Sequence, residues 1–314
     1  MGRGFDPKRA FLVFGVVFFT LSCSVHFVLW STSYFSDEKK EARSTASEPL
    51  PKPPRNTEAK YREFEAELKK ILGEEEKNIS VYLYCPDLDK NPYCYQARPM
   101  NPASMIKLFV LAKAMEDADD GKLKLTDKLT LTESNMVDGA GSVIGRGEMS
   151  AVSVKELLGL MISESDNTAT NMLIDRLGME EINKYLTENR YTDTILQHKM
   201  MLYNSGLRNY SSVRDIGDLL TKIYRHECVD EDYDEMMIEF LLKQQDRECF
   251  PVALPSWQIA HKTGEVTGVY NDGGIFYGSQ GNFVLVIMSE SDIGRAFVIE
   301  KMQAVAKLAA EVLP

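Results

Sequence analysis

From residue 56 to the end of the chain, apolar residues recur with the spacing of helices and strands. Residues 56–73 repeat them every three or four positions, which predicts an amphipathic helix that ends at Gly73. Residues 79–85 alternate and are rich in β-branched and aromatic side chains, so we expect a strand. Residues 93–97 follow a turn-forming stretch, which predicts the second strand of a hairpin.

The middle of the chain has mainly helical periodicity. Apolar residues fall on one helical face in residues 154–162, 168–177 and 216–224. Residues 192–210 lack a regular pattern, so we expect a long loop there. Together these patterns predict an all-α subdomain at about residues 118–225.

The last third of the chain returns to strands. After a helix at residues 232–244, three runs predict strands at 257–263, 268–278 and 283–289, and residues 294–312 predict a closing helix. Strands near both chain ends must then share a sheet. The prediction is an α/β fold of three layers, α-β-α, with an antiparallel sheet and an inserted all-α subdomain. We expect the site in the cleft between the two parts.

The N-terminal stretch differs from this body. Residues 10–30 carry no charge, and at about 1.5 Å per residue a helix of this length spans about 31 Å, enough to cross a bilayer. Basic residues in 1–9 favour a cytoplasmic tail, with the body outside the cytoplasm. A cleaved signal peptide, or lipid attachment at Cys23, is the alternative. Residues 31–55 are rich in Ser, Glu, Lys and Pro and predict a disordered linker before a domain at 56–314.

The composition of the chain limits which ligands and partners we expect. The net charge of −11 argues against nucleic acid, and no Cys/His spacing is typical of a metal site, so we expect neither metal nor cofactor. Outside the cytoplasm, disulfides Cys85–Cys94 and Cys228–Cys249 are plausible, with thiols as the alternative.

Residues 101–115 carry the first candidate chemistry. Asn101 is a good N-cap before Pro102, so Ser104 should lie in the first helical turn, with its N–H open to an anion. Lys107 follows three residues later in a helix that is apolar nearly all round. A buried lysine is costly unless its pKa falls, and such an amine can activate a neighbouring serine. The alternative is that Lys107 reaches the surface and Ser104 only caps the helix.

Two further motifs accompany this pair. A Ser-Asp-Asn motif begins at Ser165 between two helical segments, and a Lys-Thr-Gly motif begins at Lys262 at the end of a strand. With the Ser-x-x-Lys motif at Ser104, in this order, the chain resembles the class A β-lactamases and the wider group of penicillin-recognising serine enzymes, which includes D,D-peptidases. The resemblance extends over about residues 56–314.

The resemblance implies a role for each catalytic residue. Ser104 would be the acylated nucleophile and Lys107 the base that takes its proton. Ser165 would pass a proton to the leaving nitrogen. The backbone N–H groups of Ser104 and Glu265 would form the oxyanion hole.

It also implies a set of binding residues. Asn167 would hold the side-chain amide of the substrate. Lys262 and Thr263 would bind the substrate carboxylate, with Gly264 completing the binding motif. We expect Asp166 to hold the turn rather than to react.

The sequence departs from the class A pattern in two places. That class carries a loop glutamate that activates the deacylating water. Here Met200 or Met201 occupies the approximate place, and a thioether cannot take a proton from water; His198 or Glu164 is the candidate substitute. The stretch between Glu265 and Arg295 also has no Lys or Arg to help bind a substrate carboxylate.

Three functions follow from this pattern. The first is a membrane-anchored serine hydrolase that opens β-lactam amides. The second is a peptidoglycan D,D-peptidase or penicillin-binding enzyme that acts on a D-Ala-D-Ala-type peptide and deacylates slowly. The third is a module that binds or senses such ligands without turnover.

Overall fold

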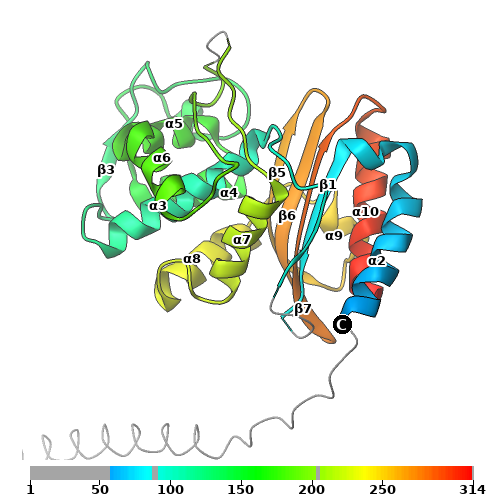
Figure 1. Ribbon diagram of the computed structural model, residues 1–314. Coiled ribbons are helices and arrows are strands. Elements are labelled where there is room, and N and C mark those ends of the chain that lie inside the picture. The colour runs from blue at the N-terminus through cyan, green and yellow to red at the C-terminus, as the bar shows by residue number, and fades with distance from the viewer. Residues whose placement is uncertain (1–56, 87–90, 203–205, 313–314) are drawn as a thin grey trace, which may run out of the picture. The chain divides into compact units, whose positions relative to one another are not determined.

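Figure 1 shows the computed structural model, which describes residues 57–86, 91–202 and 206–312. These residues belong to the second of two compact units, Met1–Arg55 and Asn56–Pro314. The predicted tail, transmembrane helix and linker lie outside the described residues. Within the described ranges, no helix has the length and apolar character needed to span a bilayer.

An antiparallel sheet, five-stranded within the described residues, forms the centre of the domain. Val81 of the first strand lies opposite Ile287 of the last, so strands from both ends of the domain pair as predicted. The strands lie in the order β2–β1–β7–β6–β5 and comprise β1 (Ile79–Tyr84), β2 (Tyr93–Tyr95), β5 (Gln258–Val266), β6 (Val269–Gly278) and β7 (Gly281–Glu290).

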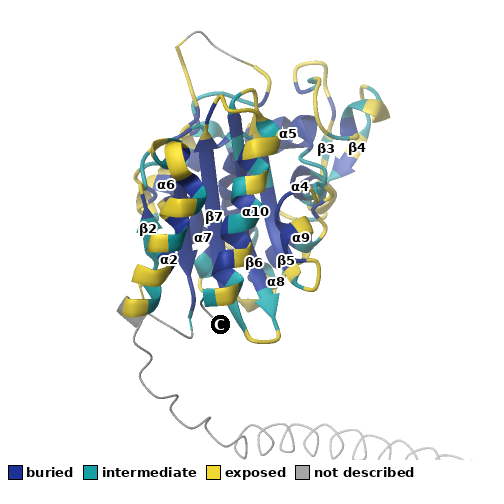
Figure 2. Ribbon diagram, turned by 90° about the vertical axis from the view of Figure 1, so that its right-hand side faces the viewer, coloured by how far each residue is buried: buried dark blue, intermediate teal, exposed yellow. Residues whose placement is uncertain are grey.

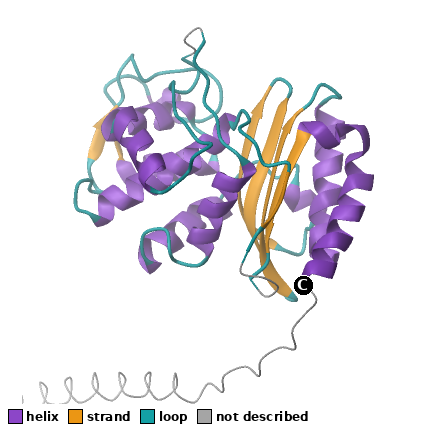
Figure 3. Ribbon diagram, in the orientation of Figure 1, coloured by secondary structure: helices purple, strands orange, loops and turns teal. Residues whose placement is uncertain are grey.

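Helices cover both faces of this sheet (Figure 1, Figure 3). On one face lie α2 (Thr57–Leu72), the short α9 (Phe250–Ala253) and α10 (Arg295–Val312). Apolar side chains such as Leu68 and Val305 pack there in one core with strand residues. Figure 2 shows the strands buried beneath α2 and α10, whose outer sides are exposed. The predicted three-layer arrangement is therefore confirmed.

The opposite face carries the predicted helical subdomain. Its central helix, α3, is buried nearly all round by the helices packed against it, as its apolar sequence predicts. A second core joins this subdomain to the sheet. Its helices are α3 (Lys107–Asp119), α4 (Val154–Ser163), α5 (Asn167–Leu177), α6 (Met179–Glu188), α7 (Val213–Tyr224) and α8 (Glu231–Leu242).

Some local structure differs from expectation. The helix predicted from Asn101 begins as a 3-10 turn, η2 (Ala103–Ile106), which leads into α3. Two short strands, β3 (Lys128–Thr130) and β4 (Ala151–Ser153), and α9 were not expected, because three or four residues are too few to show a periodic pattern.

The predicted disulfides are wrong, because the described residues contain no disulfide. Cys85 packs in the core on the α10 side of the sheet, whereas Cys94 pairs with Tyr82 and packs on the opposite side. Cys228 and Cys249 are likewise divided between the two cores. Nearness in sequence misled the prediction, since neighbouring strand positions point to opposite faces of a sheet.

Candidate active site

Ser104 lies in η2, directly before α3. A 3-10 turn has three residues, so side chains three positions apart project from the same side, and Ser104 and Lys107 share a face. Ala103 has φ of 45° in the left-handed region, and the Asn101 side chain accepts its N–H at 2.9 Å. Ser104 itself is half-buried and lines a pocket, so its hydroxyl can meet a ligand.

Lys107 is fully buried and contacts Ser165 and Asn167, which line this pocket. Its Nζ lies 2.6 Å from the carbonyl oxygen of Ser165, 3.1 Å from Ser165 Oγ and 2.9 Å from Asn167 Oδ1. Burial lowers the pKa of Lys107 well below its usual value, and the positive charge of Lys262 lowers it further. The surface alternative for this lysine is therefore excluded, and the lowered pKa favours the neutral amine, the form that can accept a proton.

The turn between α4 and α5 presents Ser165. This residue has φ of 56°, a conformation that a serine adopts only when its surroundings hold it. Asp166 supplies that support, because its buried carboxylate accepts N–H groups from Val143 and Ala169, both at 2.7 Å. A side chain at Gly141 would clash with Asp166, so that glycine permits the close packing. Asp166 holds the turn, as expected from the sequence.

Strand β5 contributes Lys262. Its Nζ donates to Ser165 Oγ at 3.1 Å and to the carbonyl oxygen of Thr263 at 2.8 Å. Burial lowers the pKa of Lys262 to about 8, against the opposing effect of the Asp272 carboxylate. Two lysines from different elements thus converge on one serine hydroxyl, so that one residue from each of the three motifs meets at Ser165.

Gly264 packs against the segment that carries Ser104. A Cβ on this residue would lie 2.5 Å from the Pro102 carbonyl oxygen, so the strand backbone packs directly against the segment that carries the nucleophile. Gly264 does not line the pocket, whereas Thr263 and Glu265 on either side of it do. The missing side chain allows close packing between β5 and η2, and the role of Gly264 in substrate binding stays a prediction.

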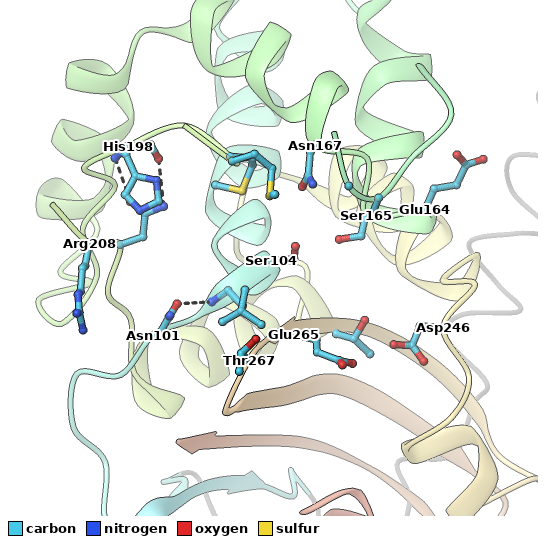
Figure 4. A pocket seen from close by; sticks show the side chains of 18 of the residues that line it. Asn101, Ser104, Glu164, Ser165, Asn167, His198, Arg208, Asp246, Glu265 and Thr267 are labelled. Atoms are coloured by element: carbon cyan, nitrogen blue, oxygen red, sulfur yellow. Dashed lines mark hydrogen bonds between the residues drawn. The ribbon is translucent and has the colours of Figure 1, made fainter. Parts of the chain in front are cut away.

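The pocket at these residues has a volume of about 880 Å³. Ser104, Ser165 and Asn167 face the same space in Figure 4. His198 and Arg208 lie at one end, while Glu164, Asp246 and Glu265 lie toward the other. The pocket is lined by Asn101, Ala103, Ser104, Gly139, Ala140, residues 163–165, Asn167 and residues 244–246, by His198, Met200, Met201 and residues 206–209 of the loop, and by Thr263 and residues 265–267.

The loop of residues 192–210 forms one wall without a carboxylate. Its pocket-lining residues include His198, Met200 and Met201, and none of the described loop residues that line the pocket is Asp or Glu. The backbone of Met200 is fixed by Asn171, whose amide bonds its N–H at 2.8 Å and its carbonyl oxygen at 3.1 Å. Asn171 lies one helical turn after Asn167, so the two side chains share a helix face. This spacing could have identified Asn171 from the sequence as a residue near the site.

A cation that the sequence did not predict lies near the mouth of the pocket. Arg295, at the start of α10, donates to Glu265 and lies 2.7 Å from Glu248. Sequence separation hid this contact, since Arg295 is 30 residues from Glu265. No group of three or more His, Cys, Asp or Glu side chains in the described ranges could hold a metal ion.

Known proteins share this fold. A β-lactamase from Sphaerobacter thermophilus DSM 20745 superposes with a TM-score of 0.73 at 22% identity, over 80% of this chain and 97% of that one. PBP-A superposes with a TM-score of 0.71 at 25% identity, over 78% of this chain and 94% of its own.

Sequence comparison gives two further matches. The D-alanyl-D-alanine carboxypeptidase DacF of Bacillus subtilis (strain 168) is 29% identical over 134 residues, which are 41% of this chain and 34% of DacF. The chain thus matches about a third of that relative's length. The model of a family described as the β-lactamase enzyme family matches residues 63–313, most of the chain. The chain therefore belongs to the β-lactamase enzyme family of serine hydrolases.

Proposed function

We propose that this chain opens β-lactam-type amides through an acyl-enzyme on Ser104. The observation that carries the proposal is the buried amine of Lys107, which lies 3.1 Å from Oγ of Ser165, a residue that lines the same pocket as Ser104. Burial lowers the pKa of this amine and so favours its neutral form, which can act as a base.

The acylation step follows from these groups. Lys107 Nζ takes the proton of Ser104 Oγ as that oxygen bonds to the carbonyl carbon of the substrate. The N–H groups of Ser104 and Glu265 stabilise the resulting oxyanion, and the loss of one such donor typically costs about 3 kcal/mol. Ser165 then gives its proton to the departing nitrogen as the C–N bond breaks, and takes one from Lys107 across their hydrogen bond.

Substrate recognition uses the opposite walls of the pocket. Lys262 and Thr263 bind the carboxylate of the substrate, since Lys262 is the cation of β5 that reaches Ser165. Asn167 accepts from Lys107 through Oδ1, which leaves its amide nitrogen oriented toward the carbonyl oxygen of Asp138 and the pocket. That nitrogen can donate to a carbonyl group on the substrate side chain.

A D,D-peptidase is the second candidate. The loop wall around Met200 lacks the carboxylate that would activate a deacylating water, and such general-base help is typically worth roughly 10²–10⁴-fold. The partial match to a D-alanyl-D-alanine carboxypeptidase fits this reading. We also propose that residues 10–30 anchor the catalytic domain outside the cytoplasmic membrane, on the strength of their sequence alone.

Intact-mass time courses with a penicillin distinguish the candidates. β-Lactam hydrolysis predicts an adduct that forms and clears with steady turnover of a chromogenic cephalosporin. A D,D-peptidase predicts a persistent adduct and release of D-alanine from a cell-wall peptide. Ser104→Ala should abolish the adduct in either case. Ligand binding that survives Ser104→Ala, with no adduct on the wild type, would instead indicate a binding module and refute the proposal.

A further inference from the structure

Glu265 places a negative charge at the mouth of the pocket. Its side chain is 44% exposed, and it lies two positions from Thr263 on the strand that supplies the carboxylate subsite. A like charge at this place opposes the binding of an anionic substrate. The site therefore needs a compensating cation, and the stretch between Glu265 and Arg295 has none.

Arg295 meets this need from a distant part of the sequence. Its Nε lies 2.9 Å and 3.0 Å from the two carboxylate oxygens of Glu265, and its Nη1 lies 2.7 Å from Glu248. The three residues connect the edge strand β5, the start of α10 and the segment before α9. Because Nε and Nη1 are held by protein carboxylates, this guanidinium is engaged at the rim rather than directed to the substrate.

We infer that Arg295 is a positioning residue that neutralises Glu265 and thereby allows the pocket to accept substrates that carry a carboxylate. The inference rests on the proposed function, because it concerns how the Ser104 site selects its substrates. It assigns Arg295 an indirect role: the residue acts on the substrate only through the charge and position of Glu265.

Two effects of Arg295 can be separated by substrate charge. Loss of charge compensation weakens only the binding of an anionic substrate, because a neutral substrate does not interact with the uncompensated carboxylate. Loss of the brace between β5 and α10 would shift the Glu265 N–H, and that shift would slow reaction with both kinds of substrate.

The test uses one cephalosporin in two forms, with its free ring carboxylate and as the methyl ester. For Arg295→Gln we expect kcat/KM for acylation by the anionic form to fall about 3- to 10-fold, as for one uncompensated charge in a partly solvated site. The ester should change less than about twofold. High salt should shrink the difference, because the charges involved are exposed.

Three further variants sharpen the test. Arg295→Lys keeps the cation and should recover most of the lost rate. The double variant Arg295→Gln/Glu265→Gln removes both charges and should also restore acylation by the anionic form. Glu248→Gln is the matched control, because it removes the other carboxylate partner of Arg295 and leaves the Glu265 pair in place.

The outcomes separate this inference from the proposed function. If the wild type forms no adduct with either substrate, the proposed function fails. If the wild type is acylated but Arg295→Gln slows both substrates equally, or the double variant restores nothing, the proposed function stands and charge compensation by Arg295 is refuted.

Discussion

If Lys262 binds the carboxylate of the substrate, as we propose, this binding should weaken at mildly alkaline pH. Burial lowers the pKa of this lysine to about 8, so its charge is lost in a range where ordinary lysines remain protonated. The experiment therefore raises the pH from 7 to 9. The carboxylate of the substrate stays ionised throughout this range.

The size of the effect follows from that pKa. With a pKa of about 8, Lys262 is about 90% protonated at pH 7 and about 10% protonated at pH 9. If only the charged form binds the anion well, kcat/KM for an anionic substrate should fall about tenfold on this account alone. The fall should appear in kcat/KM rather than kcat, because kcat/KM reports the ionisation of the free protein.

The assay again compares a free carboxylate with its methyl ester. Lys107 also titrates, but its effect on proton transfer is common to both substrates and cancels in the ratio of their kcat/KM values. We expect this ratio to drop about tenfold between pH 7 and 9. In Lys262→Arg, whose guanidinium stays charged, the ratio should remain flat. A wild-type ratio that is constant to pH 9 would refute the assignment of Lys262 as the carboxylate-binding cation.

Three other changes test the surroundings of the site. Gly264→Ala should destabilise the domain by about 1–3 kcal/mol in denaturant melts and slow acylation, whereas Gly145→Ala, where a Cβ meets no atom, should do neither. Burial raises the pKa of Asp215 to about 6 above an ordinary value of 3.8, so the folded state binds its proton more tightly. The unfolding free energy should thus fall by up to about 3 kcal/mol as pH rises from about 4 to 6, and Asp215→Asn should remove this fall. Met200→Glu should speed clearance of the penicillin adduct by as much as 10²–10⁴-fold, read by intact mass after removal of free drug, and an unchanged lifetime would count against the missing-base explanation.

The sequence predicted what depends on local spacing. The helices α2, α4, α5 and α10 were found because each repeats apolar residues along one face. For Lys107 the sequence left burial and a surface position as alternatives, and its contacts favour burial in a helix that is apolar nearly all round. The approach of the Ser165 and Lys262 side chains was inferred from motif resemblance rather than from periodicity.

Features that depend on contacts between distant parts of the sequence were not predicted, or were predicted wrongly. Arg295 contacts Glu265 only because the fold brings the start of α10 beside the C-terminal end of β5. The sequence alone does not indicate that these two segments are neighbours. The role of Gly264 emerged only from the distance to the Pro102 carbonyl oxygen. The disulfide prediction failed because Cys85 and Cys94 lie on opposite faces of one sheet, which neighbourhood in sequence does not reveal.

The central claim is that Lys107 deprotonates Ser104, and the rate of penicillin acylation with peptide mapping of the adduct tests it most directly. The wild type should carry one adduct, on the peptide that contains Ser104. Lys107→Met, similar in size and checked for folding by circular dichroism, should acylate roughly 10²–10⁴-fold more slowly. An adduct on another residue, or acylation of Lys107→Met at the wild-type rate, would contradict the account.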